Sequence, residues 1–94
     1  MDEPIEAIEF YWRPGCGFSA LLERQLRRAG FELDMRNIWD EPEAAAFVRS
    51  VADGNETVPT VRIGPVALVN PEPEDVVAAL EEVAPHLLVD GQGR

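Results

Sequence analysis

The sequence predicts an α/β protein in which a four-stranded mixed sheet is flanked by three helices. Segments with apolar residues at alternate positions and segments with apolar residues at helical spacing follow one another as strand, helix, strand, helix, strand, strand, helix. A helix joins the first two strands, so they are expected to be parallel. Gly64-Pro65 separates the last two strands by a turn, which predicts an antiparallel hairpin. Helices are then expected on both faces of the sheet.

The first half of the chain contains two predicted strands and the helix between them. Ile8, Phe10 and Trp12 lie on one face of an alternating stretch, which predicts a strand over residues 5–12. Pro14-Gly15 breaks that strand. The next elements are a helix over residues 17–29 that Gly30 ends, and a second strand over residues 31–38.

The second half of the chain contains two further helices with expected caps. Asp40 is expected to cap the second helix, with Glu43 three residues later as in a capping box. Asn70 is expected to cap the third helix, with Pro71 at its first position and Pro85 stopping it. The remaining predictions are a buried helical stripe ending at Val51, strands over residues 60–63 and 66–69, and a tail over residues 86–94 that frays after a short packed turn at residues 87–88.

Composition and charge limit the classes of function. A single domain over residues 1–94 is expected, because the chain is short and 46% of its residues are hydrophobic. The formal net charge of −10 argues against nucleic acids and anionic membranes as partners. The acidity predicts a solvated surface, with the steering of basic partners as the alternative. The acidic start, the lack of a long apolar run and the single cysteine together predict a reducing cytoplasm.

Cys16 is the only cysteine, and it lies where the first strand gives way to the first helix. A thiol at a helix N-terminus faces unpaired backbone N–H groups and the positive end of the helix dipole, and both favour the thiolate. Arg13 adds a positive charge nearby. Because the thiolate is the nucleophilic form, Cys16 is predicted to be reactive. The alternative is a buried, inert cysteine of the core.

The order of elements, together with two motifs, resembles the thioredoxin fold and, within it, the glutaredoxin family. The run Arg-Pro-Gly-Cys-Gly-Phe-Ser at residues 13–19 is similar to the active-site loop of that family, and Val58-Pro59 is similar to its cis-proline. Propensity alone favours a trans bond before Pro59, and the resemblance predicts a cis bond. The resemblance covers residues 5–83, and it is greatest to the mycoredoxins of mycothiol-using bacteria, through residues 44–61 and 68–71.

The chain departs from the mycoredoxin pattern in its active-site loop. Mycoredoxins usually carry a second cysteine where this chain has Ser19. Cys-Gly-Phe-Ser is instead the loop of the monothiol glutaredoxins, many of which handle iron–sulfur clusters. The chain lacks the extra segment and the Trp-Pro motif of that group. Asn70-Pro71 stands where glutaredoxins have the Gly-Gly pair that helps to hold glutathione.

The resemblance implies a role for each residue around the catalytic Cys16. Ser19 and Arg13 each have a structural alternative, as a plain first-turn serine and as a solvated charge. Trp39 either roofs the thiol-binding groove or packs on the second helix. The full set of expected site residues is Arg13, Gly17 and Ser19 as stabilisers of the thiolate, and Phe18, Trp39, Thr57, Val58 and Pro59 as the binding site of the small thiol.

Two further side chains are expected to have no catalytic role. Trp12 is expected to pack within its strand rather than to wall the site. His86, the only histidine, is expected to be hydrogen-bonded or solvated. No spacing typical of a zinc or calcium site occurs.

The resemblance implies a monothiol thiol–disulfide oxidoreductase. The Cys16 thiolate would reduce mixed disulfides between proteins and a small thiol, mycothiol or glutathione, with no cofactor beyond that thiol. The alternative from another class is a carrier in which two Cys16 thiolates and two small thiols hold a [2Fe–2S] cluster between two chains. A family member that only binds a partner is a third possibility. A monomer is expected in the first case and a dimer in the second.

Overall fold

The computed structural model describes residues 4–88, and its elements follow the predicted order. Four strands form one sheet in the order β2-β1-β3-β4. β1 is parallel to β2, whereas β3 is antiparallel to both β1 and β4, so the predicted mixed sheet is confirmed. The elements are β1 (Ile8–Trp12), α1 (Gly17–Arg28), β2 (Leu33–Asn37), α2 (Pro42–Val51), β3 (Thr60–Ile63), β4 (Val66–Val69), α3 (Pro73–Val83) and a 3₁₀ turn at Pro85–Leu87.

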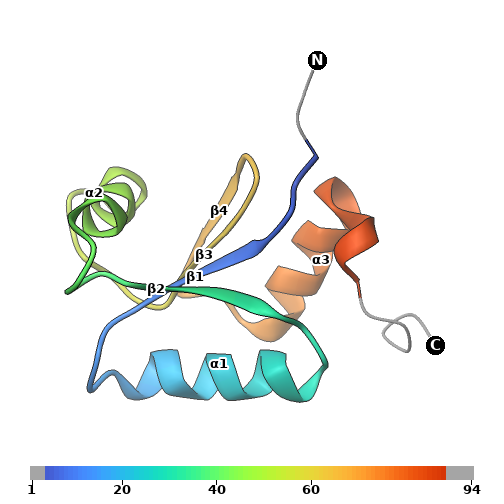
Figure 1. The fold of residues 1–94 in the computed structure, drawn as a ribbon, viewed down its shortest axis with the longest axis horizontal. Helices are drawn as coiled ribbons and strands as arrows, with labels where there is room; N and C mark the ends of the chain where they lie inside the picture. Colours follow the sequence, from blue (N-terminus) through green and yellow to red (C-terminus); the bar gives the residue numbers. More distant parts are fainter. Residues whose placement is uncertain (1–3, 89–94) are drawn as a thin grey trace.

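The helices lie on both faces of the sheet, as predicted (Figure 1). α1 and α3 cover one face, and α2 lies on the opposite face. This arrangement leaves the connection between β1 and α1 at one end of the sheet. Cys16 lies in that connection.

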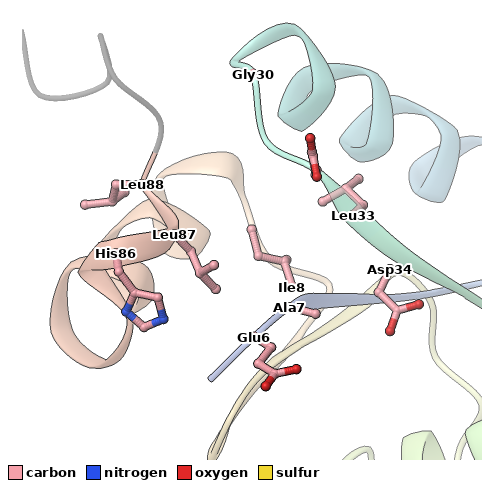
Figure 2. A pocket seen from close by; sticks show the side chains of 10 residues that line it. Glu6, Ala7, Ile8, Gly30, Leu33, Asp34, His86, Leu87 and Leu88 are labelled. Atoms are coloured by element: carbon pink, nitrogen blue, oxygen red, sulfur yellow. The ribbon is translucent and has the colours of Figure 1, made fainter. Parts of the chain in front are cut away.

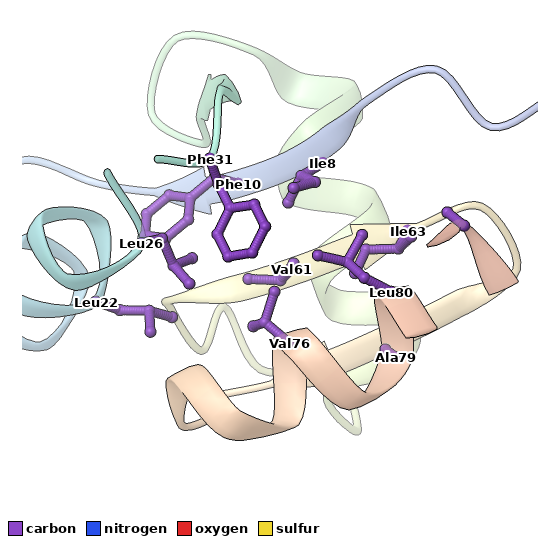
Figure 3. Packing of buried hydrophobic residues seen from close by; sticks show 11 residues of the cluster. Ile8, Phe10, Leu22, Leu26, Phe31, Val61, Ile63, Val76, Ala79 and Leu80 are labelled. Atoms are coloured by element: carbon purple, nitrogen blue, oxygen red, sulfur yellow. The ribbon is translucent and has the colours of Figure 1, made fainter. Parts of the chain in front are cut away.

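The larger hydrophobic core fills the space between the sheet and the pair α1 and α3 (Figure 3). Ile8 and Phe10 of β1 both face this core, because alternate residues of a strand point to the same side. Phe10 is fully buried, and burial of a side chain of this size stabilises the fold by roughly 1.5–3 kcal/mol. The main contributions from other elements are Leu22 and Leu26 of α1, Val61 and Ile63 of β3, and Val76 and Leu80 of α3.

A smaller core lies on the α2 side of the sheet. Tyr11 faces this side because it follows Phe10 in the strand. Val48 is its fully buried contribution from α2. Cys16 is partly buried and packs against the edge of this smaller core. The thiol is therefore supported on one side by packed apolar side chains.

The predicted cap of α2 is wrong. Glu41, rather than Asp40, is the N-cap residue, and its side chain makes no capping hydrogen bond. Asp40 instead accepts a hydrogen bond from Asn37 Nδ2 at 3.2 Å. Asn37 thus competes for the carboxylate that was expected to cap the helix. Pro42 occupies the first helical turn, where its missing N–H costs nothing.

The predicted cap of α3 is also wrong. The helix begins at Pro73 rather than at Pro71, and Glu72 is its N-cap. Glu72 and Asp75 form a reciprocal capping box, in which the Glu72 backbone N–H donates to the Asp75 carboxylate at 2.9 Å. Asn70 lies before the helix, with a φ of 52°.

The remaining differences concern the ends of elements. β1 begins at Ile8 rather than at residue 5, and β2 is Leu33–Asn37 rather than residues 31–38. α1 ends at Arg28, one residue earlier than expected. Gly30 and Gly64 have φ values of 98° and 58°, which the turns after α1 and within the hairpin require.

The structure of the segment after α3 agrees in part with the prediction from the sequence. The helix ends before Pro85, and the 3₁₀ turn stands where a short packed turn was expected. The expected fraying of residues 89–94 lies outside the described residues. Across residues 4–88, no helix combines the length and apolar character needed to cross a membrane.

A long-range hydrogen bond joins the two ends of the described chain. His86 Nε2 donates to the carbonyl oxygen of Ile5 at 2.7 Å, across 81 positions of sequence. The bond connects the turn after α3 to the segment that leads into β1. His86 is thus hydrogen-bonded, as expected, and it lies at the start of β1 rather than near Cys16.

Candidate active site

The connection between β1 and α1 places the Cys16 thiol at the start of a helix. Pro14 and Gly15 form the turn after β1, and Gly15 has a φ of 81°. Cys16 is the N-cap residue of α1, with extended backbone angles, and its carbonyl accepts the first helical bond from Ala20 N–H at 3.1 Å. The predicted location of the thiol at a helix N-terminus is confirmed. The side chain is partly exposed, so the alternative of a fully buried cysteine is wrong.

Opposing influences act on the charge of this thiol. Burial raises the pKa of Cys16 and is the largest single influence. The Ser19 hydroxyl and the backbone N–H groups of Ser19 and Phe18, as donors to the charged sulfur, together with the charge of Arg13, lower the pKa. The lowering influences prevail, so the pKa of Cys16 is below its ordinary value. The thiolate is consequently more accessible than in an ordinary cysteine, which is the direction that the sequence predicted.

Ser19 contributes to this balance through a buried hydroxyl. Its side chain is 2% exposed, and its Oγ has no partner in hydrogen-bond geometry among the described residues. A hydroxyl rotates to suit its acceptor. The Ser19 Oγ–H is therefore available to the sulfur once the sulfur carries a negative charge, and it is the strongest of the influences that lower the pKa of Cys16, although burial acts more strongly in the opposite direction.

The backbone at Val58 and Pro59 faces the thiol from the other side of the site. The Val58-Pro59 peptide bond is cis, as the resemblance predicted. The Cys16 Sγ lies 3.7 Å from the carbonyl oxygen of Val58, to which the neutral thiol donates a weak hydrogen bond. Residues 42 positions apart in the sequence are thus in contact at the site.

Two hydrogen bonds hold the cis-proline segment in place. Thr60 Oγ1 donates to the carbonyl oxygen of Thr57 at 2.8 Å, and Asn70 N–H donates to the carbonyl oxygen of Pro59 at 2.7 Å. Asn70 was expected to cap α3 and instead supports this segment from β4. Its positive φ is a conformation that asparagine tolerates better than most residues, and this property is the only sequence signal for its position.

Arg13 and Trp39 meet beside the thiol. The Arg13 guanidinium carbon lies 5.8 Å from the centre of the Trp39 ring, within the range of a cation–π contact. Trp39 is 62% exposed and packs against neither core, so the alternative in which it packs on α2 is wrong, and its role as a roof over the thiol-binding groove stays a prediction. The sequence analysis did not identify Asn37, whose Oδ1 accepts a hydrogen bond from Trp39 N–H at 2.9 Å. Ile38 N–H donates to Trp12 O at 2.9 Å, which brings the two loops together.

The other predicted site residues occupy the surface of the loop or the core. Phe18 is 72% exposed and lies outside the core, as expected, whereas its contact with a small thiol stays a prediction. Gly17 has open space around it. Trp12 packs against the larger core, as expected, and its buried Nε1–H has no partner among the described residues.

A separate pocket is bordered by the start of β1 and the turn after α3 (Figure 2), whereas Cys16 follows the other end of β1. It has a volume of about 460 Å³, and the side chains of Glu6, Asp34 and His86 border it. No residue of the β1–α1 connection lines this pocket. In residues 4–88, no group of three or more His, Cys, Asp or Glu side chains is arranged to hold a metal ion.

Comparison with known proteins agrees with this geometry. Residues 8–67 match the family model for glutaredoxin. The chain belongs to the glutaredoxin family. Two Mycobacterium tuberculosis proteins, named "Putative glutaredoxin MT3292" (strain CDC 1551 / Oshkosh) and "Putative glutaredoxin Rv3198A" (strain H37Rv), are each 35% identical to it over 79 residues, which cover 83% of this chain and 94% of theirs.

Solved structures confirm the thioredoxin-like fold of this glutaredoxin-family chain. The solution structure of a Brucella melitensis glutaredoxin is 28% identical, with a TM-score of 0.61 and coverage of 96% of both chains. NrdH-redoxin from Escherichia coli, described as a glutaredoxin-like protein with a thioredoxin-like activity profile, is also 28% identical, with a TM-score of 0.64 and coverage of 76% of this chain and 91% of its own. This chain differs from a two-cysteine redox protein in having only Cys16.

Proposed function

We propose that this glutaredoxin-family protein is a monothiol oxidoreductase that reduces mixed disulfides between a small thiol and proteins. The observation that carries the proposal is the partly exposed Cys16 sulfur, which lies at a helix N-terminus and 3.7 Å from the carbonyl that precedes a cis-proline. The lowered pKa of Cys16 supports a nucleophilic role.

The proposed reaction has two exchange steps. In the first, the Cys16 thiolate attacks the small-thiol sulfur of the mixed disulfide, the S–S bond breaks, and the protein leaves as a thiolate that takes up a proton. Cys16 then carries the small thiol as a new mixed disulfide. In the second step, another small-thiol thiolate attacks that small-thiol sulfur and releases Cys16. In total, the protein thiol is regenerated, one free small thiol is consumed, and the small thiol from the mixed disulfide leaves joined to it as their disulfide.

The backbone opposite Cys16 supports the binding of the small thiol. The N–H and C=O groups next to a cis-proline pair with an extended ligand as an added strand would. Val58 supplies those groups, with Thr57 preceding it and Pro59 fixed by Asn70. We propose mycothiol as the small thiol, with glutathione as the second choice, because the similarity to mycoredoxins favours the former and Asn70-Pro71 replaces the Gly-Gly pair. We place the reaction in the cytoplasm, on a monomer.

Replacement of Cys16 tests the reaction directly. Cys16→Ser is expected to abolish turnover of a protein or peptide mixed disulfide, because the chain contains no other thiol. The wild-type protein is expected to gain the mass of one small thiol when the reductant is withheld. Each mixed disulfide, with mycothiol and with glutathione, is assayed with its own thiol as reductant. Turnover by Cys16→Ser would falsify the proposal.

The monothiol loop also favours a second candidate, a carrier of a [2Fe–2S] cluster. Cys16 supplies one of the four sulfurs that such a cluster needs, and its partial exposure suits a ligand shared with a second chain. The other sulfurs come from the partner chain and two small thiols. Anaerobic reconstitution with iron, sulfide and each small thiol separates the candidates. A coloured dimer supports the carrier, and a colourless monomer that turns over mixed disulfides supports the enzyme.

A further inference from the structure

One face of α1 leads away from the thiol and is uncovered along its length. We call it the α1 outer face and define it by Phe18, Leu21, Arg24, Gln25 and Arg28. All five side chains are exposed, and Phe18 and Leu21 are 72% and 45% exposed despite being apolar. Their spacing of three and four residues places them in one exposed stripe along the helix, which adjoins the side that carries Leu22 and Leu26 into the core.

The charges of this helix differ from those of the whole protein. α1 contains three arginines and one glutamate, although the chain has a formal net charge of −10. Arg27 pairs with Glu23 at 2.9 Å. Within residues 4–88, neither Arg24 nor Arg28 has an ion-pair or hydrogen-bond partner, although carboxylates are abundant elsewhere on the surface.

The helix dipole accounts for only part of this pattern. Basic residues in the last turn, Arg27 and Arg28, stabilise the helix C-terminus. Arg24 lies one turn earlier, and dipole effects fall off within the last turn. A hollow of about 520 Å³ beside the face is lined by Ala20, Glu23, Arg24, Arg27 and Arg28. The guanidinium groups in this hollow are accessible to an acidic side chain of another protein.

We propose that the α1 outer face docks the protein part of the substrate and selects proteins whose reactive cysteine is flanked by acidic residues. This inference rests on the proposed function, since it concerns the substrate of Cys16. Phe18 and Leu21 contact the substrate next to its disulfide, and Arg24 and Arg28 bind its carboxylates. Arginine forks bind carboxylates in two parallel hydrogen bonds, which gives both affinity and direction.

The distances set the length of the motif that can bind. With a helical rise of about 1.5 Å per residue, Arg24 and Arg28 lie about 12 Å and 18 Å along the helix from Cys16. An extended peptide advances about 3.3 Å per residue, so acids three to five positions from the cysteine reach the arginines. At physiological salt, charges more than about 8 Å apart are largely screened, so the distant acidic surface has little effect at these two arginines. The nearer carboxylates are Glu23, which is paired with Arg27 in the same hollow, and Glu74 and Glu81 of α3, which line a groove with Gln25.

Three peptide substrates test the proposal. Each carries one cysteine as a mixed disulfide with the small thiol that supports turnover, and each has Glu, Gln or Lys three to five positions away on both sides. The wild-type protein is expected to reduce the Glu peptide about threefold faster, in kcat/KM, than the Gln peptide, and the Lys peptide more slowly than either. The preference is expected to fall with rising salt.

Charge-reversed variants locate the preference. Arg24→Glu and Arg28→Glu are each expected to reduce the Glu-to-Gln ratio about threefold. Arg49→Glu is the control for charge, because it makes the same change of charge on α2, on the opposite face of the sheet. It also breaks the ion pair of Arg49 with Glu56, and it is expected to leave the ratio unchanged. Equal ratios for all three peptides, or equal effects of Arg24→Glu and Arg49→Glu, would overturn the proposal.

A small substrate separates this inference from the proposed function. The mixed disulfide of the small thiol with mercaptoethanol has no peptide to dock, so its rate is expected to be the same in the wild-type, Arg24→Glu and Arg28→Glu proteins. If this substrate is turned over but the three peptides are reduced at equal rates, docking on α1 is refuted and the oxidoreductase activity still stands. A lack of turnover of every substrate would contradict the oxidoreductase itself.

Discussion

The reactivity of Cys16 depends on a small number of neighbouring groups that act in opposite directions. Burial against the smaller core favours the neutral thiol, and the weak hydrogen bond to the Val58 carbonyl does the same. The Ser19 hydroxyl, the first amides of α1 and the Arg13 guanidinium favour the thiolate. Because the favourable groups come from one short segment, residues 13–19, single substitutions there are expected to change the chemistry without changing the fold.

Ser19→Ala tests the hydroxyl in this balance. Although burial is the largest influence on the pKa of Cys16, the Ser19 side chain is the strongest of those that lower it, so its loss is expected to raise that pKa. Alkylation of Cys16 at neutral pH should slow about fivefold. At acidic pH, where the thiol is neutral, the free energy of unfolding should not fall, because the substitution removes a buried hydroxyl that has no partner there. At higher pH it should fall, since the hydroxyl no longer stabilises the thiolate. If the alkylation rate of Ser19→Ala depends on pH in the same way as that of the wild-type protein, Ser19 has no role in lowering the pKa of Cys16.

Trp39→Ala tests whether the indole ring holds Arg13 near the thiol. Loss of the cation–π contact is expected to free the guanidinium and to slow alkylation of Cys16 about twofold. In an Arg13→Ala background, Trp39→Ala should have no further effect, because the charge that the ring positions is already absent. Additive effects of the two substitutions would mean that Trp39 acts on Cys16 by another route.

At the scale of the element, helix starts are decided by side chains that compete for the same backbone groups. α1 begins with a thiol and carries no acid in its first turn, whereas α3 begins with a complete capping box. The uncapped start of α1 leaves its amides available to the Cys16 sulfur. The capped start of α3 serves stability, and it lies outside the β1–α1 connection.

Asp75→Ala tests this division between stability and reactivity. Loss of the reciprocal bond with Glu72 is expected to lower the free energy of unfolding by about 1 kcal/mol in urea denaturation. The rate of Cys16 alkylation should stay the same, since α3 contributes no group to the thiol's surroundings. Glu74→Ala is the matched control, because it removes an acid from the same helical turn without removing the capping bond. Equal losses in the two variants would assign the effect to charge rather than to the cap.

Patterns within one segment were predictable from the sequence, and contacts between segments were not. The alternation in β1 and the spacing in α1 depend on the covalent period of the chain, so both elements were predicted to within a few residues. Asp40 and Glu41 are both chemically able to cap α2, and the outcome depends on Asn37, which lies in another element. The cis bond at Val58-Pro59 was predictable only from the family resemblance.

The same limit applies to the site. Cys16, Ser19 and Arg13 lie within seven consecutive residues, at the end of one connection and the start of α1, so their proximity could be predicted from the sequence. The contact of Trp39 with Arg13 depends on the hydrogen bond between Ile38 and Trp12 that extends the pairing of β1 with β2. No periodicity or propensity encodes that contact, because it follows from the register of the sheet.

At the scale of the whole molecule, the sheet separates two environments with different chemistry. The side under α1 and α3 is a continuous apolar core. The side under α2 mixes apolar and ionisable groups, in which Tyr11 donates to Glu9 Oε1 at 2.6 Å and stacks at 5.0 Å from Phe47.

Tyr11 is expected to make the free energy of unfolding depend on pH in alkaline solution. Burial and the hydrogen bond to Glu9 raise its pKa to about 12, from 10.0. Because the folded state holds the phenol neutral, stability is complete below about pH 10 and is expected to fall by about 1.4 kcal/mol per pH unit between about pH 10 and 12. Tyr11 is the only tyrosine and the chain has no lysine, so phenolate absorbance and urea denaturation follow this one group.

The matched control for Tyr11 is a phenylalanine. Tyr11→Phe keeps the ring beside Phe47 and removes the titrating hydroxyl. Its stability is expected to be independent of pH over the same interval. A phenolate midpoint near 10 in the folded wild-type protein would contradict the expected neutral, hydrogen-bonded phenol.

The hydrogen bond between His86 and Ile5 has a practical consequence for experiments on this protein. It keeps the segment before β1 beside the turn after α3. Cys16 follows the other end of the same strand, and five residues of strand span about 17 Å. A fluorescent reporter or a surface tether attached through either of these neighbouring segments would point away from the sulfur and leave it open to its reagents.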